Sequence, residues 1–217
     1  MVVPSPTFDL ETTLGAQENR PIAGVDEVGR GAWAGPVYAA AVILNPHTLP
    51  PGLRDSKTLS ETRREGLSAL LWDCAQIGVG RAEVEEIDQI GVGKATYVAM
   101  QRAVLALPQK PAAAIIDGLH APDLGEVEAH TLIKGDRHSL SVAAASIAAK
   151  VARDQLMRSL HLDFPHFSWD RNKGYGAKIH AAALETHGVT DHHRQSFAPI
   201  RRLIDAKHLD ERFTRTH

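Results

Sequence analysis

The chain has 217 residues, a 43% share of hydrophobic residues and a formal net charge of −2. This length fits one α/β domain with a small appendage, and no apolar run is long enough to span a membrane. The single cysteine, Cys74, excludes an intramolecular disulfide and favours a reducing, cytoplasmic setting. Residues 1–20 lack a basic start followed by an apolar core, so we expect a flexible lead-in rather than a signal peptide.

The first half of the chain predicts a β-hairpin followed by alternating helices and strands. Residues 21–26 and 36–44 are apolar runs that lie close enough in sequence to pair as a hairpin. Ser60 is suited to cap a helix that reaches Cys74. The further elements expected here are a strand at 75–82, a short helical turn at 83–89, a helix at 93–107 and a strand at 112–117.

The second half of the chain is predicted to be mainly helical, after a strand at residues 127–133. The longest helix candidate, residues 139–160, has a face of alanines that allows close packing on a sheet. Helices are also expected at residues 175–187, ended by Gly188, and at residues 200–213. Hairpin strands followed by mixed helices and strands indicate an α/β domain with a mixed sheet.

The first strand ends in two adjacent acids, Asp26 and Glu27. Ionised carboxylates are costly to bury without a positive partner, and divalent cations with oxygen ligands are a common one. Because neighbouring strand residues point to opposite faces, both acids can serve one site only if the strand ends there. Solvated acids at a strand end are the alternative interpretation.

A glycine–arginine–glycine turn at residues 29–31 follows these acids directly. Gly29 and Gly31 lack a Cβ atom, so the backbone there can turn sharply and lie close to a ligand. Arg30 offers a planar fork of donors that suits a phosphate group. A simple hairpin turn is the alternative.

Two later acids repeat this pattern. Asp117 ends an apolar strand and precedes a glycine, and it would share a sheet edge with Asp26 if the two strands are neighbours. Asp136 lies just before the long helix, where a capping role is the alternative. Asp154 would lie roughly 27 Å farther along a straight helix, so it cannot share this site, and we expect it to be structural and ion-paired with Arg153.

These motifs occur in the order seen in one known family. Asp-Glu-Val-Gly-Arg-Gly resembles the signature of ribonuclease HII, which nicks the RNA strand of duplexes that contain ribonucleotides, and the similarity runs from about Ile22 to Pro199. Lys-Gly-Asp, followed by Ser-Val-Ala-Ala-Ala-Ser-Ile-Ala-Ala-Lys-Val-Ala-Arg-Asp, is close to the family's longest motif. The resemblance implies a ribonuclease H-like mixed β-sheet flanked by helices at residues 21–160. A helical C-terminal extension at residues 161–217 would complete the substrate-binding surface.

The resemblance also implies a metal-dependent endoribonuclease. Asp26, Glu27, Asp117 and Asp136 would hold two Mg²⁺ or Mn²⁺ ions for phosphodiester hydrolysis that leaves a 3′-hydroxyl and a 5′-phosphate. The residues themselves fit this chemistry, because four acids would gather without a Cys/His ligand set. The twelve histidines contain no zinc-binding motif, so we expect structural or surface roles for them.

Recognition of RNA needs a group that senses a 2′-hydroxyl. Tyr175, held between two glycines, is suited to stack on a sugar or base, with a packing role as the alternative. In the family, the equivalent tyrosine and the backbone equivalent to residues 29–31 read the RNA–DNA junction, which implies cleavage 5′ of a ribonucleotide embedded in DNA. Lys57, in an Asp-Ser-Lys motif that also matches the family, is a candidate phosphate contact, with a solvated loop lysine as the alternative. Ala177 replaces the threonine that usually follows this Gly-Tyr-Gly motif.

The expected partners are RNA/DNA hybrids and duplex DNA that contains ribonucleotides. Residues 171–217 carry nine Lys+Arg and five Asp+Glu, which suits a phosphate-tracking surface or a solvated helix face. We expect a monomer. No peptide with paired aromatic residues suggests a sliding-clamp partner. The alternatives are a ribonuclease HIII-type enzyme and a non-catalytic nucleic-acid-binding module.

Overall fold

The computed structural model describes residues 5–18 and 20–214. In this part of the chain, five strands form one sheet in the order β3-β2-β1-β4-β5. β1 (Ile22–Val28) pairs antiparallel with β2 (Val37–Ile43), which pairs antiparallel with β3 (Gln76–Ala82). The predicted hairpin and the third strand are therefore present.

The other two strands lie on the opposite side of β1. β4 (Ala113–Asp117) runs parallel to β1, and β5 (Glu128–Leu132) runs parallel to β4. The register between β1 and β4 stops at the pair Val25 and Ile116, although β1 continues along β2 to Val28. The sheet is mixed, as predicted, and the last residues of β1 are paired on one side only.

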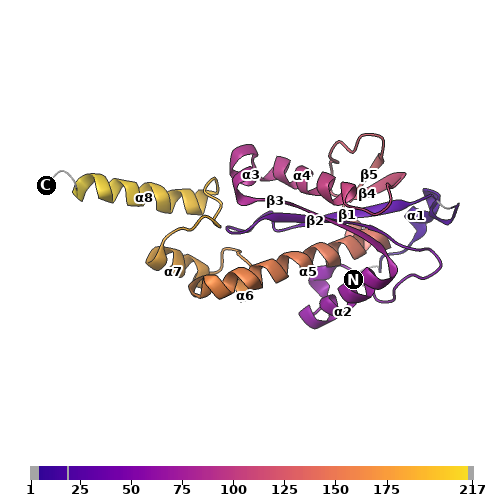
Figure 1. Cartoon of the computed structure of the whole chain (residues 1–217), viewed down its shortest axis with the longest axis horizontal. Coiled ribbons are helices and arrows are strands. Elements are labelled where there is room, and N and C mark those ends of the chain that lie inside the picture. Colours follow the sequence, from indigo (N-terminus) through magenta and orange to yellow (C-terminus); the bar gives the residue numbers. More distant parts are fainter. Residues whose placement is uncertain (1–4, 19, 215–217) are drawn as a thin grey trace.

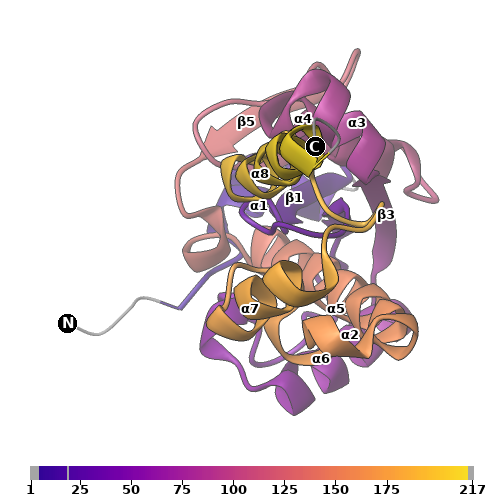
Figure 2. The ribbon, with the colours of Figure 1, turned by 90° about the vertical axis from the view of Figure 1, so that its left-hand side faces the viewer.

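Helices cover both faces of this sheet (Figure 1). One face carries α3 and α4, and the other carries α2 and α5, an arrangement that the view along the sheet also shows (Figure 2). Their bounds are α2 (Glu61–Cys74), α3 (Val84–Ile90), α4 (Val92–Leu105) and α5 (Leu140–Asp163). The predicted α/β class with helices on both sides of a mixed sheet is confirmed.

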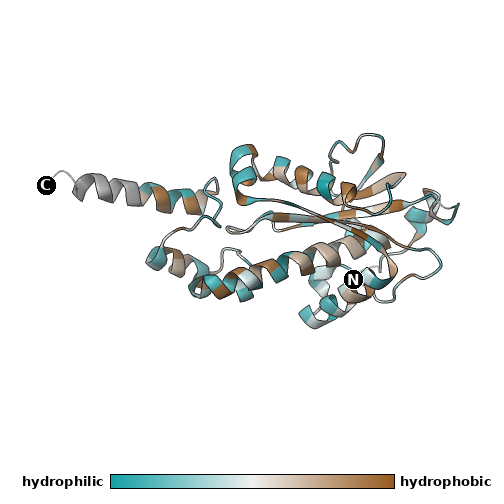
Figure 3. Ribbon diagram, in the orientation of Figure 1, coloured by the Kyte–Doolittle hydropathy of each residue, from teal (hydrophilic) through white to brown (hydrophobic). Residues whose placement is uncertain are grey.

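Alternating side chains along β2 build a core on each face. Val37, Ala39 and Ala41 pack in the cluster that contains α4, whereas Ala40 and Val42 pack against α2 and α5. Figure 3 shows hydrophobic residues along these central strands and hydrophilic residues over much of α3. Two separate layers of apolar contacts therefore stabilise the sheet.

The long helix α5 lies unusually close to the sheet. Its residues include several fully buried alanines, such as Ala143, Ala144 and Ala145. A Cβ atom added to Gly24 of β1 would lie only 2.1 Å from the carbonyl carbon of Ser141. Small residues on both elements thus allow the close approach that the alanine face predicts.

The C-terminal helices gather beyond the end of β1 (Figures 1 and 2). They are α6 (Trp169–Asn172), α7 (Lys178–His187) and α8 (Ala198–Thr214). Met157 of α5 packs with Phe167 and Trp169 in the core of this extension. α5 thus runs across the boundary expected at residue 160 and contributes to both parts. Among the described residues, no helix combines the length and apolar character needed to cross a membrane.

The N-terminal segment contains a helix that the sequence analysis did not predict. In α1 (Asp9–Thr13), the fully buried Glu11 accepts hydrogen bonds from the Ser139 hydroxyl at 2.6 Å and the Ser141 amide at 2.8 Å. A carboxylate is stabilised at this place, because it lies at the positive N-terminal end of α5. This part of the expected flexible lead-in is therefore docked on the domain.

Candidate active site

Three of the predicted acids meet where the pairing between β1 and β4 stops. Asp26 and Glu27 lie in β1, and Asp117 is the last residue of β4. One carboxylate oxygen from each lies within 4.8 Å of the others. These three are the group with metal-ligand spacing among the described residues, so the histidines form no comparable cluster there.

β1 does not end at these acids, contrary to the condition inferred from the sequence. Glu27 still pairs with Ala39 of β2, and the strand continues to Val28. The two neighbouring side chains nevertheless converge with Asp117 at a place where β1 no longer pairs with β4, because that pairing stops at Val25 and Ile116. The early end of the parallel pairing, rather than the end of β1, brings the three carboxylates together.

The environment of this cluster disfavours three separate negative charges. Burial, followed by the charges of Glu27 and Asp117, raises the pKa of Asp26 well above its usual range, against a lowering by the Ser146 hydroxyl and the Glu27 amide. Burial also raises the pKa of Glu27, against a lowering by Arg30. Hard oxygen donors that repel one another in a buried place fit a divalent cation such as Mg²⁺ or Mn²⁺.

Asp136 lies beside this cluster rather than within it. It occupies a short turn, Gly135–Arg137, and the Gly135 amide donates a 2.7 Å hydrogen bond to Asp117 Oδ1. Burial and the charges of Asp55 and Asp117 raise the pKa of Asp136. The predicted set of four acids therefore consists of a tight group of three and a fourth acid connected to it through Asp117.

Asp55 is a buried acid at this site that the sequence analysis did not single out. Its carboxylate accepts hydrogen bonds from the Lys57 amide at 2.9 Å and the Arg137 guanidinium at 3.3 Å. From the sequence, only Lys57 of the motif Asp55-Ser56-Lys57 was predicted to be functional, although Asp55 lies two residues before it. The Ser56 hydroxyl lies 2.8 Å from that of Ser146, so the same loop contacts a residue that lowers the pKa of Asp26.

The turn at residues 29–31 begins immediately beyond the acids. Gly29 has a φ of +92°, a backbone conformation that residues with a Cβ atom rarely adopt. The exposed Arg30 lies 3.3 Å from Glu27 Oε1, so its guanidinium contacts the acidic cluster directly. A Cβ atom on Gly31 would meet no atom within 4 Å, which leaves the backbone there open to a ligand.

Tyr175 lies on the turn between α6 and α7, packed next to the first glycine turn. The amides of Trp33 and Ala34 both donate to the carbonyl of Gly174, at 2.8 and 3.2 Å. A Cβ atom on Gly176 would lie 2.2 Å from the Trp33 ring. The helix expected from residue 175 begins instead at Lys178, and this leaves Tyr175 on the turn with 36% of its surface exposed.

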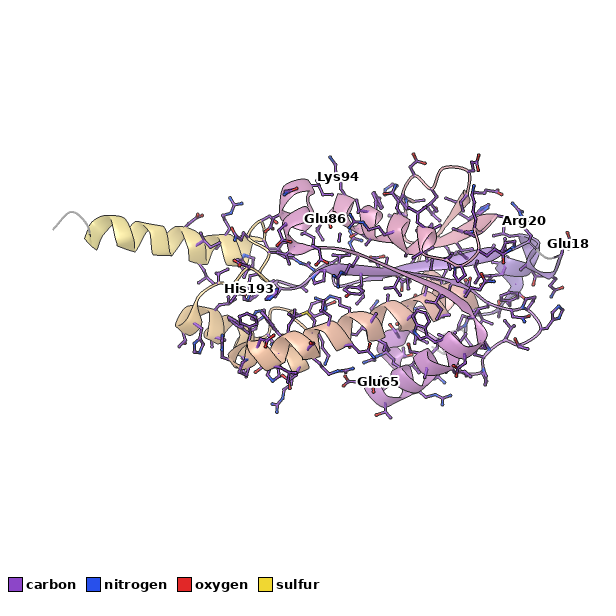
Figure 4. All side chains as sticks on the ribbon, viewed as in Figure 1. Glu18, Arg20, Glu65, Glu86, Lys94 and His193 are labelled. Atoms are coloured by element: carbon purple, nitrogen blue, oxygen red, sulfur yellow. The ribbon has the colours of Figure 1, made fainter. Side chains whose placement is uncertain are left out.

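A buried pair of histidines, His180 and His193, is hydrogen-bonded to the turn that carries Tyr175. His193 lies inside the molecule, between α8 and the end of the sheet (Figure 4). Its Nδ1 accepts from the Thr190 amide at 3.0 Å, so in the neutral ring Nε2 carries the proton and donates to His180 Nε2, also at 3.0 Å. His180 Nδ1 then donates to the Tyr175 carbonyl at 2.9 Å. Both rings have the structural role expected for the histidines.

Arg153 and Asp154 are also structural, but they are not paired with each other. Asp154 forms a 2.7 Å ion pair with Lys150, one turn earlier on α5. Arg153 is fully buried and donates to three backbone carbonyls. The expected Arg153–Asp154 ion pair is therefore wrong, because each side chain leaves the helix toward a different neighbour.

A mixed sheet of this order has a ribonuclease H-like fold, and carboxylates gathered beside two adjacent strands are what a metal-dependent nuclease of this class requires. The sequence profile of the family described as Ribonuclease HII matches residues 23–200. The chain belongs to the ribonuclease HII family, and it is an endoribonuclease of this type. The matching family model is that of ribonuclease HII, as the sequence analysis predicted.

Individual relatives agree with this assignment. Ribonuclease HII from Jannaschia sp. (strain CCS1) is 48% identical over 199 residues, which cover 92% of this chain and 98% of the relative. Ribonuclease H2 from Pyrococcus horikoshii OT3 has the same fold, with a TM-score of 0.73 at 23% identity over 85% of this chain and 97% of that one. The PCNA:RNase HII complex from Archaeoglobus fulgidus gives a TM-score of 0.68 at 25% identity, over 82% and 95% of the two chains.

Proposed function

We propose that this enzyme hydrolyses the RNA strand of RNA/DNA hybrids and cuts duplex DNA on the 5′ side of embedded ribonucleotides. Family membership supports the endoribonuclease chemistry. The observation that carries the site assignment is the convergence of Asp26, Glu27 and Asp117, whose oxygens lie within 4.8 Å of one another. A non-catalytic binding module would have no need for three acids held against their mutual repulsion.

The acids Asp26, Glu27 and Asp117 would hold Mg²⁺ or Mn²⁺, and Asp136 would complete the site. Two such ions, when bound, supply an activated water and charge stabilisation for the leaving 3′ oxygen. The chain positions the carboxylates: the Gly135 amide fixes Asp117, and the Glu27 amide donates to Asp26 Oδ1 at 2.7 Å. Breaking the bond to the 3′ oxygen leaves a 3′-hydroxyl and a 5′-phosphate.

The substrate would lie across the two glycine turns. The open backbone of residues 29–31 is placed to contact the sugar-phosphate chain, and the ring of Tyr175 is placed to stack on the sugar or base at the RNA–DNA junction. Arg30 and Lys57, both exposed, would bind phosphates on either side of the acids. The basic segment at residues 171–217 would extend this surface over the C-terminal extension.

We further propose that residues 21–160 form the catalytic core and residues 161–217 a substrate-binding extension, and that the enzyme acts as a cytoplasmic monomer. The single, half-buried Cys74 is compatible with a reducing compartment. The relative from Archaeoglobus fulgidus forms a complex with PCNA. A sliding-clamp partner for this chain stays a prediction, which a pull-down with a purified clamp would test.

The decisive experiment is a cleavage gel on a DNA duplex that carries one ribonucleotide, with Mg²⁺, with Mn²⁺ and with a chelator. We expect one metal-dependent cut on the 5′ side of the ribonucleotide. Intact substrate in every lane, from protein shown to be folded, would support the binding module instead. Cutting only within longer RNA tracts would retain the metal site but reject the junction role of residues 29–31 and Tyr175.

A further inference from the structure

Two arginines, Arg153 and Arg194, are fully buried directly behind the proposed substrate face. Among the described residues, neither lies within ion-pair distance of a carboxylate, and every hydrogen bond from their guanidinium groups goes to a backbone carbonyl. Burying a cation without a carboxylate partner is costly. We therefore asked which backbone segments these two guanidinium groups hold in place.

Arg153 connects the two turns that carry the proposed substrate contacts. Its Nε donates to Pro36 O at 3.0 Å and its Nη2 to Ala34 O at 3.1 Å, both in the segment that follows residues 29–31. Its Nη1 donates to Lys173 O at 2.9 Å, two residues before Tyr175. One planar group on the rigid helix α5 thus holds both turns.

The same guanidinium lies between the two recognition elements themselves. A Cβ atom on Gly29 would lie 2.2 Å from Arg153 Nε, so the backbone of that glycine rests on the guanidinium. On the other side, the Cζ atom of Arg153 lies 5.4 Å from the centroid of the Tyr175 ring, within the range of a cation–π contact.

Arg194 holds the opposite side of the first turn. Its Nε and Nη2 donate to Gly35 O at 2.9 and 2.7 Å, and its Nη1 donates to Arg30 O at 2.9 Å. It makes none of the contacts to Lys173 and Tyr175 that Arg153 makes. The link between the two turns through a buried cation is therefore specific to Arg153.

We propose that Arg153 is a positioning residue that sets the spacing between the backbone of residues 29–31 and the ring of Tyr175, and thereby the preference for a single ribonucleotide in DNA over a long hybrid. The inference rests on the proposed function of these two elements. Arg153 is too deeply buried to touch nucleic acid and acts through them. A lysine could not replace it, because a single ammonium cannot reach three carbonyls set around a planar fork.

The test is a double-mutant cycle of Arg153→Lys and Tyr175→Leu. The quantity measured is the ratio of kcat/KM on a duplex with one ribonucleotide to kcat/KM on a long hybrid. We expect Arg153→Lys to lower this ratio on the order of tenfold, the lower end of what misplaced contacts cost. In the Tyr175→Leu background, the same change should lower the ratio little further.

Additive losses in the two variants would overturn the role of Arg153 while leaving Tyr175 as a substrate contact. An unchanged ratio in Tyr175→Leu alone would instead reject the proposed function of the tyrosine. Mn²⁺ affinity, measured by calorimetry without substrate, should be the same in Arg153→Lys and the unaltered enzyme. A loss of Mn²⁺ affinity would mean that the substitution damages the metal site, which contradicts a role confined to recognition.

Asp154→Asn is the matched control. It alters the next residue of α5, which is also buried, and removes the ion pair with Lys150 without touching either turn. We expect this variant to be less stable but to keep the substrate ratio. An equal fall of the ratio in Asp154→Asn would show that general loosening of α5 is sufficient, which would overturn the proposal.

A second pair of variants serves if Arg153→Lys does not fold. Tyr175→Phe keeps an aromatic ring over the guanidinium, whereas Tyr175→Leu removes it. Retention of the substrate ratio in Tyr175→Phe and its loss in Tyr175→Leu would show that the aromatic ring carries the preference, as both the stacking on the substrate and the contact with Arg153 require. Equal losses in both variants would assign the preference to the hydroxyl and overturn the inference.

Discussion

Each carboxylate of the cluster is held by a backbone or side-chain donor that is independent of any ion. Asp117 is the clearest case, since its Oδ1 accepts from the Gly135 amide at 2.7 Å. An asparagine retains an acceptor at this position but removes the charge. The effect of this residue on catalysis can therefore be separated from its effect on folding.

Asp117→Asn should abolish cleavage and spare the fold. We expect the turnover rate to fall by roughly a hundredfold or more, as when other groups that stabilise developing charge are removed. The far-ultraviolet circular dichroism spectrum should be unchanged. Near-normal turnover would refute the assignment of Asp117 to the metal site.

Metal binding should stabilise the protein, because the metal-free cluster is strained electrostatically. The pKa of Asp26 is raised in the folded state, so the folded protein binds the proton more tightly, and stability falls as pH rises above the ordinary pKa of 3.8. At neutral pH, Asp26→Asn should raise the unfolding free energy of the metal-free protein by on the order of 1–3 kcal/mol.

Thermal melts at pH 7.5 with a chelator, and then with Mg²⁺ or Mn²⁺, would check this expectation. The unaltered protein should melt at a higher temperature with metal, and Asp26→Asn should respond less. A variant that is less stable than the unaltered protein in chelator would show that the acids do not repel one another as inferred.

At the scale of elements, α7 begins without a side-chain cap. Ala177 occupies the N-cap position with extended backbone angles, φ −78° and ψ 155°, and no side chain accepts a hydrogen bond there. The threonine usual in the family would supply the missing acceptor. Ala177→Thr should therefore stabilise the protein by about 1 kcal/mol, the typical value of such a cap.

Urea denaturation would measure this change, with Ala177→Val as the control. Valine has the shape of threonine without the hydroxyl, so it should give no stabilisation. If both variants stabilise the protein equally, packing rather than capping explains the effect.

The sequence predicts most elements of the fold because their apolar patterns are local. The alanine face of α5 and the apolar run of β2 are visible as periodicities, and the structure contains both. Contacts between distant segments were not visible. Glu11 caps the start of α5 from 130 residues away, as measured to Ser141, and nothing near it in sequence indicates that partner.

The candidate site was likewise only partly predictable. Strand ends that carry acids indicated Asp26 and Asp117, but the convergence of Glu27 depends on where β4 stops pairing, which is a property of the sheet. Asp55 was not predicted, because the motif that contains it was interpreted through Lys57 as a phosphate contact. Arg153 was assigned an ion pair because an acid follows it, although helix geometry directs the two side chains apart.

At the scale of the whole molecule, the C-terminal extension has buried polar groups at its centre. The Thr190–His193–His180–Tyr175 chain of hydrogen bonds lies within its core. Burial lowers the pKa of His193 from 6.5 to about 3, and burial also lowers the pKa of His180. Global stability should therefore depend on pH through these rings.

Between pH 6.5 and about 3 the unfolded chain binds a proton on His193 that the folded chain does not. Stability should thus fall as pH falls, with a slope approaching about 1.4 kcal/mol per pH unit for this one group. His193→Asn keeps an acceptor for the Thr190 amide but cannot titrate, so its slope should be smaller. Denaturant titrations from pH 7 to pH 5 would measure both slopes, and equal slopes would contradict the role of His193.

The uninterrupted helix α5 has a consequence for the accuracy with which the cutting position is chosen. Ser146, whose hydroxyl lowers the pKa of Asp26, and Arg153, which holds both glycine turns, are on one helix about two turns apart, roughly 10 Å along its axis. If the substrate binds as proposed, this helix fixes the distance between the phosphodiester bond that is cut and the sugar that Tyr175 contacts. Cutting one nucleotide away from the correct bond, a shift of about 3.4 Å along a strand, would require this distance along α5 to change. The cutting position would then be set by the backbone hydrogen bonds of one helix rather than by the side chains that touch the substrate.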